Sequence, residues 1–132
     1  LLKIAGQSSV VRFSEEDVAW TFPEMSHDEV AAIYLEVGPS VFIITHGSGG
    51  CTMFVKNGKQ FVPSEKNPAI VFTVGAGDNF NAGVLSALAK RGLCKGDVLR
   101  NVTLDEWAKI GAEANVVAYN HLLRVNGVAK AA

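Results

Sequence analysis

A glycine-rich turn between an apolar run and a helical pattern constrains the fold of this sequence most. The run Ala69–Thr73 (AIVFT) leads into Thr73–Gly83 (TVGAGDNFNAG), which places Gly75 and Gly77 just before Asp78. One or two glycines suffice for a tight turn, so this longer stretch indicates a backbone that approaches a ligand closely. In open α/β sheets, ligands bind where strand ends lead into helices. The stretch therefore predicts a strand, a ligand-binding turn and a helix, in that order.

Further strands are predicted from short apolar runs. Ser9–Phe13 (SVVRF) and Val41–Thr45 (VFIIT) are typical of buried strands, the second of a strand covered on both faces. Cys51–Val55 and Gln60–Pro63 flank Lys56-Asn57-Gly58-Lys59, and an Asn-Gly pair between two such runs predicts a β-hairpin.

Helices are predicted from capping pairs, in which a hydroxyl residue precedes an acidic residue by three positions. The pairs are Ser14 with Asp17, Ser26 with Glu29, and Thr103 with Glu106. We expect these helices to end before Pro23, at Gly38 and near Leu123. A fourth helix is expected from Asp78 to Arg91, with Gly92 as its C-terminal cap.

Apolar residues at helical spacing indicate which helix faces are buried. In the helix after the glycine turn these are Phe80, Val84, Leu85 and Leu88. The aromatic residues Trp20, Tyr34 and Trp107 are expected in the core rather than at a ligand. Helices that alternate with covered strands predict a single layered α/β sheet with helices on both faces.

Composition excludes several classes of function. The chain has 132 residues and a formal net charge of −1, so no basic field favours nucleic acid. No apolar run approaches the roughly 20 residues of a membrane helix, and we expect no membrane partner. Cys51 and Cys94 lack metal or redox spacing and are typical of idle thiols in a reducing, cytoplasmic compartment.

The glycine turn has the chemistry of an anion site. Backbone N–H groups of the turn and of the first helical turn point to one spot, and the helix dipole adds about half a positive charge. Asp78 would either cap the helix or accept a proton from a hydroxyl that attacks a phosphate. Neither a dinucleotide fingerprint nor a Walker loop fits, because Phe80 replaces a glycine of the first and no Gly-Lys-Ser/Thr occurs.

These residues resemble the C-terminal signature of the ribokinase-type (PfkB) sugar kinases, which is close to DTxGAGDxFxAG. The stretch Thr45–Gly50 (THGSGG) is similar to the nucleotide loop TxGxxG of that family, and Ser14–Trp20 (SEEDVAW) resembles the fructokinase-like branch. The resemblance implies a ribokinase-like layered α/β sheet, of which residues 1–132 are the C-terminal, nucleotide-binding half. The positions that match the signature are Thr73, Gly75, Ala76, Gly77, Asp78, Phe80, Ala82 and Gly83.

The resemblance also implies a function and roles for single residues. It implies transfer of the γ-phosphoryl of ATP to a primary hydroxyl of a sugar, with a fructose-like ketose as the first expectation. Asp78 would be the general base, and the amides of Gly75, Ala76 and Gly77 would form the anion hole. Further implied roles are contact with the nucleotide for Thr45, Gly47 and Gly50, a place near the adenine for Asn115, and organisation of Mg²⁺ and phosphate by Ser14 and Asp17 in place of an Asn and a Glu.

Departures from the family pattern qualify these expectations. Phe72 stands where the family has an Asp, so the side-chain ligand of a monovalent cation is lost and cation activation is in doubt. The resemblance implies that an N-terminal sugar-binding half and its lid strands precede these residues, so this chain alone is expected to be inactive. Its expected partners are a sugar and that missing half, and the resemblance allows a homodimer formed through the absent lid.

Two other functions stay open at this point. One is a non-catalytic nucleotide-binding or scaffold protein built on the same fold. The other is a kinase whose acceptor is a nucleoside or a sugar acid, because the residues that would contact the acceptor precede this stretch of sequence.

Overall fold

Four strands form one mixed sheet in the computed structural model, which describes residues 2–129. Their order across the sheet is β1-β2-β3-β4. β1 runs parallel to β2, with Ser14 opposite Thr45, whereas the β2–β3 and β3–β4 pairs are antiparallel. The strands are β1 (Val10–Ser14), β2 (Val41–Thr45), β3 (Gly50–Val55) and β4 (Gly58–Pro63).

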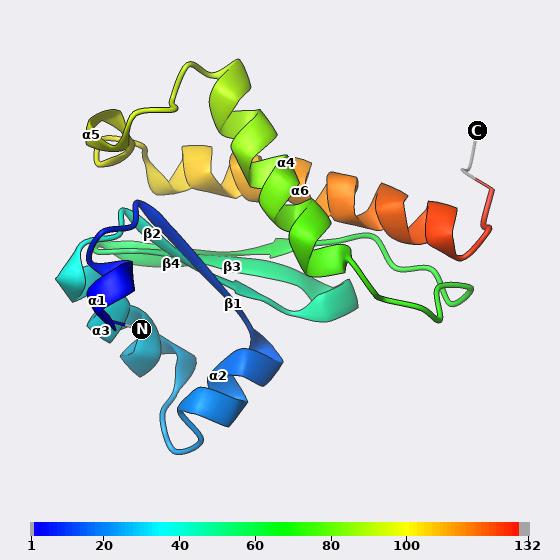
Figure 1. The fold of residues 1–132 in the computed structure, drawn as a ribbon, viewed down its shortest axis with the longest axis horizontal. Coiled ribbons are helices and arrows are strands. Elements are labelled where there is room, and N and C mark those ends of the chain that lie inside the picture. Colours follow the sequence, from blue (N-terminus) through cyan, green and yellow to red (C-terminus); the bar gives the residue numbers. More distant parts are fainter. Residues whose placement is uncertain (1, 130–132) are drawn as a thin grey trace.

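Helices cover both faces of this sheet (Figure 1), as the sequence predicts. One face carries α1 (Leu2–Ala5), α2 (Glu15–Thr21) and α3 (His27–Val37). The other carries α4 (Ala76–Lys90) and α6 (Leu104–Val125), which pack against each other, with the short α5 (Gly96–Leu99) between them in sequence. None of these helices within residues 2–129 has the length and apolar character to cross a membrane.

The strand β2 explains why the sheet has two cores. Val41 and Ile43 point to the core under α4 and α6, and Phe42 and Ile44 point to the core under α3. All four are fully buried, which confirms the interpretation of VFIIT as a strand covered on both faces. Trp107 lies in the first core and Tyr34 in the second, as predicted.

The predicted caps are present. Ser14 Oγ accepts a hydrogen bond from the Asp17 amide at 3.0 Å, and Asp17 Oδ2 accepts one from the Ser14 amide at 3.1 Å. Ser26 and Glu29 make the same pair of bonds. Gly92 has φ of 68° directly after the C-cap of α4, which is the left-handed conformation that favours glycine.

The hairpin is confirmed, but its turn lies one residue earlier than the Asn-Gly pair suggests. Val55 pairs with Gly58, so Lys56 and Asn57 form the turn. Neither Asn57 nor Gly58 has a positive φ, and the turn is therefore not the type I′ turn that Asn-Gly favours.

Three predictions about single segments are wrong. Ala69–Thr73 forms no strand, because none of the four strands pairs with it within the described residues. Trp20 is 88% exposed, because residues two apart on a helix do not share a face and Val18 takes the buried face of α2. Leu85 is 67% exposed, since Val84 and Leu88, four apart, already face the core.

A charge cluster joins α4 to α6 and makes stability depend on pH. Arg91 Nε donates to Glu106 Oε1 at 2.6 Å, Arg91 Nη2 donates to Glu113, and Lys90 Nζ lies 2.6 Å from Glu113 Oε1. The hydrogen bond from Arg91, followed by that from Lys90, lowers the pKa of Glu113 to about 2. Because this pKa is depressed, the ionised carboxylate stabilises the fold above pH 4.5, and this contribution is lost as the pH falls toward 2.

We therefore expect Glu113→Gln to lower the free energy of unfolding by about 0.5–1 kcal/mol at neutral pH. The difference from wild type should shrink below pH 4.5, where the carboxylate of the unfolded chain becomes protonated. Urea titrations from neutral pH to below pH 4.5 measure this difference in the free energy of unfolding. Glu36→Gln, on the exposed side of α3, is the control. A difference that stays constant with pH would contradict the assignment.

Candidate active site

A cavity of about 840 Å³ lies where the carboxyl ends of β1 and β2 meet the start of α4. These strands are parallel, so Ser14 and Thr45 end side by side at one edge of the sheet. Seven of the nine predicted site residues line this cavity, whereas Gly75 and Asp78 do not. The seven are Asp17, Thr45, Gly47, Gly50, Ala76, Gly77 and Asn115.

The glycine turn forms the N-terminus of α4. Gly75 is the N-cap, with φ of 86°, and its carbonyl accepts from the amide and the side chain of Asn79 at 3.0 and 2.9 Å. The Ala76 amide donates to the Thr73 carbonyl at 3.2 Å. Gly77 and Asp78 belong to the first turn, where amides have no partner four residues back. Positive potential therefore gathers at the side of the cavity that Gly77 lines.

Arg12, which the sequence analysis did not single out, adds a full positive charge at this point. Its Nε donates to Asn81 Oδ1 at 2.7 Å and its Nη1 donates to Thr45 Oγ1 at 3.1 Å. A Cβ atom on Gly77 would lie 3.0 Å from Nη2 of the same guanidinium. A planar guanidinium beside a helix N-terminus is suited to a phosphate group. The only sequence signal for Arg12 is a lone charge within an apolar strand.

The loop after β2 is held from two sides. Gly50 has φ of 112°, and a Cβ atom there would lie 2.1 Å from the Val62 carbonyl oxygen, so only glycine fits. His46 Nδ1 lies 2.5 Å from Glu15 Oε1, and His46 Nε2 lies 2.7 Å from Thr52 Oγ1. These contacts connect the loop to α2 and to β3. The sequence analysis did not single out His46, whose partner Glu15 is 31 residues away.

Carboxylates of α2 form another wall of the cavity. Glu15, Glu16 and Asp17 all line it. The bonds between Ser14 and Asp17 lower the pKa of the Asp17 carboxyl, with the bond from the Ser14 backbone amide as the largest cause. Within residues 2–129 no group of three or more His, Cys, Asp or Glu side chains could hold a metal by itself. The oxygen donors nevertheless suit Mg²⁺, which commonly combines one or two carboxylates with phosphate oxygens and water.

Asp78 lies in the first turn of α4, next to Gly77 and outside the cavity lining. Its side chain is exposed and makes no hydrogen bond to the described part of the chain. The carboxylate is therefore not used as a helix cap here, since the N-cap is Gly75 and no side chain caps this helix. It is free to meet a group that approaches from solvent.

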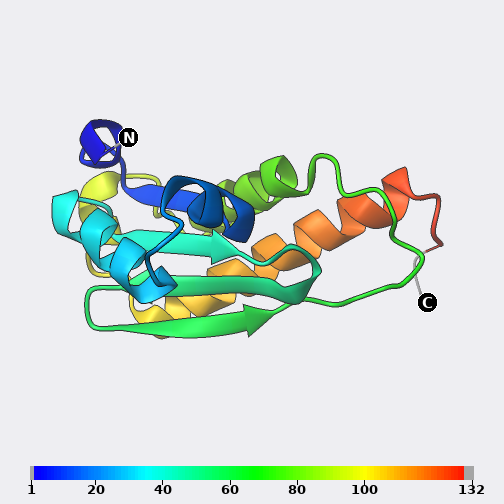
Figure 2. The ribbon, with the colours of Figure 1, turned by 90° about the horizontal axis from the view of Figure 1, so that it is seen from below.

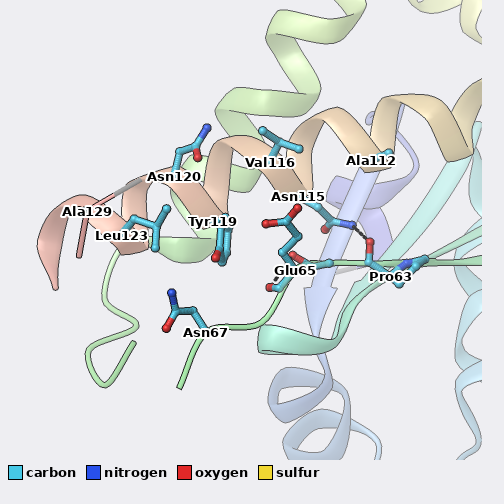
Figure 3. Close-up of a pocket in the computed structure, with 11 residues that line it drawn as sticks. Pro63, Glu65, Asn67, Ala112, Asn115, Val116, Tyr119, Asn120, Leu123 and Ala129 are labelled. Carbon is cyan, nitrogen blue, oxygen red and sulfur yellow. Dashed lines mark hydrogen bonds between the residues drawn. The ribbon is translucent and has the colours of Figure 1, made fainter. Parts of the chain in front are cut away.

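A second cavity, of about 490 Å³, opens between α6 and the chain that follows β4 (Figure 3). Ala112, Val116 and Tyr119 of α6 line one side of it. Asn115 is buried, and its Nδ2 donates to the carbonyls of Val62 and Pro63 at 3.1 and 3.3 Å. Asn115 thus ties α6 to the end of β4. The two cavities share Ser64, Glu65, Asn67, Asn115 and Tyr119, so they are continuous.

Comparison with known proteins gives the family. Residues 1–121 match the family described as pfkB family carbohydrate kinase. The chain belongs to this family. The match confirms the resemblance that the glycine signature indicates.

Relatives of this pfkB-family chain include a fructokinase of Rhizobium leguminosarum bv. trifolii. It is 42% identical over 86 residues, which are 65% of this chain and 26% of the fructokinase. The chain thus spans about a quarter of the length of this curated relative.

Solved structures of similar fold include a fructokinase of Vibrio cholerae O395, in a form with bound fructose, ADP and calcium ion. It has a TM-score of 0.71 at 24% identity and is matched over 89% of this chain and 35% of its own. An aminoimidazole riboside kinase of Salmonella enterica has a TM-score of 0.72 at 22% identity, over 98% of this chain and 39% of its own. At these identities the likeness shows the fold, which is ribokinase-like.

Proposed function

We propose that this chain is the nucleotide-side part of an ATP-dependent sugar kinase. The enzyme would transfer the γ-phosphoryl of ATP to a primary hydroxyl of a sugar, with a fructose-like ketose as the first candidate. The observation that carries this proposal is the meeting of the α4 N-terminus, the Arg12 guanidinium and the Gly47–Gly50 loop at one cavity. Catalysis of phosphoryl transfer consists mainly of positioning and of stabilising negative charge, and this cavity offers both.

In this proposal the phosphate chain lies in the cavity beside Arg12 and the start of α4. The amides of Gly75, Ala76 and Gly77 form the anion hole. The Gly77 amide and the neighbouring Asp78 amide, which have no acceptor in the described residues, contribute most, because the Ala76 amide already donates to Thr73. Thr45, Gly47 and Gly50 lie beside the nucleotide. Such prearranged donors stabilise the charge that develops on the transferring phosphoryl.

Asp78 is proposed as the general base. Its carboxylate is exposed and unpaired at the end of the anion hole, where it can accept the proton of an acceptor hydroxyl. Glu16 and Asp17 would hold Mg²⁺ from the α2 side of the cavity. When bound there, this ion supplies neutralisation of charge on the nucleotide phosphates.

The adenine ring is proposed to occupy the smaller cavity in Figure 3. The aromatic ring of Tyr119 and the side chains of Ala112 and Val116 offer a largely apolar wall for a flat base. Asn115 lies beside that place, but its side-chain amide already donates hydrogen bonds to the carbonyls of Val62 and Pro63. Its proposed role is therefore to hold the wall of the base site.

We also propose that the chain acts as the C-terminal half of a longer polypeptide and is inactive alone. It covers 26% of the Rhizobium fructokinase and 35% of the Vibrio one. Val71, Phe72 and Val74 expose 79%, 66% and 82% of their surface beside the site, which suits contact with further protein. The acceptor site, and a homodimer through lid strands, would belong to that further part, and the free cysteines suit a cytoplasmic protein.

The second candidate function is a kinase for a nucleoside, which the fold likeness to an aminoimidazole riboside kinase favours. Assays of ADP release by the full-length gene product with fructose, other ketoses, sugar acids and nucleosides distinguish the two. ADP release that requires a ketose supports the proposal. Nucleotide binding without turnover of any acceptor would favour a non-catalytic scaffold instead.

Independence of monovalent cations is a further expected outcome. The Phe72 side chain has no ligand atom, and its carbonyl oxygen already accepts from Asn126 Nδ2 at 2.8 Å. Phe72 therefore offers no side-chain ligand to a monovalent cation. We expect the same kcat in potassium, sodium and tetramethylammonium chloride at equal ionic strength. Strong activation by potassium alone would contradict this expectation.

A further inference from the structure

The segment that leads into the glycine turn, residues 69–74, has no fully buried side chain. Val71, Phe72 and Val74 all expose most of their side-chain surface, and residues 69–73 take no part in the sheet. Figure 2 shows this segment running past the end of the sheet, beside the C-terminal end of α6, before it enters α4. Something other than burial must hold the chain immediately before Gly75.

Asn126, the C-cap residue of α6, holds this segment by its carboxamide. Its Oδ1 accepts from the amides of Val71 and Phe72, both at 2.9 Å. Its Nδ2 donates to the carbonyls of Phe72 and Leu122, both at 2.8 Å. One side chain thus uses two donor hydrogens and two acceptor sites, which is the full capacity of an amide.

His121, five residues earlier on α6, holds the next stretch. Its Nε2 lies 3.0 Å from the Val74 carbonyl oxygen. Because a carbonyl only accepts, Nε2 carries the proton in this arrangement. A Cβ atom on Gly75 would lie 2.7 Å from the same Nε2, so the imidazole also abuts the turn.

We propose that Asn126 and His121 are positioning residues that set the place of the anion-binding turn relative to α6. The turn and the nucleotide wall then share one support, because Asn115 and Tyr119 of the same helix line the nucleotide cavity. The kinetic consequence rests on the proposed kinase function. A displacement of about 1 Å at a reacting group can cost as much as 100-fold in rate.

The hydrogen bonds from Val71 and Phe72 to Asn126 form a tether, and amide hydrogen exchange tests it without depending on activity. In the full-length gene product, Asn126→Ala should make the Val71 and Phe72 amides exchange at least about tenfold faster, because each loses its acceptor. Asn101→Ala is the matched control, since Asn101 is exposed and its side chain makes no hydrogen bond to the described residues. Unchanged exchange at both amides in Asn126→Ala would overturn the proposal.

The positioning role is tested by kinetics on the same proteins. We expect kcat to fall by about 10- to 100-fold in Asn126→Ala and His121→Ala, with the KM for ATP nearly constant. His121→Gln keeps a donor near the place of Nε2 and should restore most of the rate. Faster exchange with wild-type kcat would overturn the positioning role, as would a loss that only follows a lower melting temperature. A wild-type protein without kinase activity would refute the proposed function, while the exchange result still decides the tether.

Discussion

If Asp78 is the general base, as proposed, its replacement by asparagine should lower kcat of the full-length protein by about 10²- to 10⁴-fold. Asparagine keeps the size and the hydrogen-bonding shape of the side chain, but it cannot take the proton of the acceptor hydroxyl. The exposed place of Asp78 at the start of α4 means that the change disturbs no packing. The KM for ATP and the melting temperature should therefore stay near their wild-type values.

Asp105→Asn provides the matched control for this experiment. Asp105 is also an exposed acid in the first turn of a long helix, and it lies outside both cavities. Its replacement should leave kcat unchanged. An Asp78→Asn enzyme that keeps the wild-type rate would show that another group accepts the proton.

Replacement of Gly50 by alanine should cost about 3–5 kcal/mol of the free energy of unfolding. The φ of 112° at Gly50 is strained for any residue with a side chain, and the new methyl group would lie 2.1 Å from the Val62 carbonyl oxygen. This neighbour is backbone of β4 and cannot turn away. The displaced strand would also carry Asn115 with it, because Asn115 binds Val62 and Pro63, so ATP affinity should fall as well.

Gly47→Ala separates the cost of the backbone conformation from the cost of the steric clash. Gly47 lies in the same loop with φ of 59°, but a Cβ atom there would have no neighbour within 4 Å. Alanine at this position should cost only about 1–2 kcal/mol, from the left-handed conformation alone. Urea denaturation of both variants gives the comparison, and equal losses would contradict the steric explanation.

The elements that depend on local chemistry could be predicted from the sequence. The bonds of Ser14 with Asp17 and of Ser26 with Glu29 join residues three apart, so the pattern contains both partners. The alternation of Val41–Ile44 between two cores follows from the strand period, and it could be inferred because every residue of the run is apolar.

The run Ala69–Thr73 is a segment whose structure the local sequence pattern could not predict. A strand requires a neighbour that accepts its ladder hydrogen bonds, and the apolar pattern says nothing of whether such a neighbour exists. In the structure the amides of Val71 and Phe72 and the carbonyl of Phe72 bond to the Asn126 side chain, 54 residues from Phe72. That partner has no local sequence signal.

The candidate site was predictable only in part, for the same reason. Thr45 and three of the glycines lie at strand ends and at a helix start, where α/β sheets place ligand sites, and the structure brings them to one cavity. The three glycines are Gly47, Gly50 and Gly77. Arg12 was missed because its partners Thr45 and Asn81 are 33 and 69 residues away. His46 was not singled out because its partner Glu15, on α2, is 31 residues away.

Direct detection of phosphoryl transfer tests the central claim. The full-length gene product would be incubated with fructose and with ATP whose γ-phosphoryl group carries ¹⁸O, and the products would be identified by mass spectrometry. The account predicts ADP and a sugar phosphate that carries the labelled phosphoryl on a primary hydroxyl, and it predicts that Asp78→Asn suppresses this product. Label that appears only in inorganic phosphate, or ATP that is bound and never consumed with any acceptor, would contradict it.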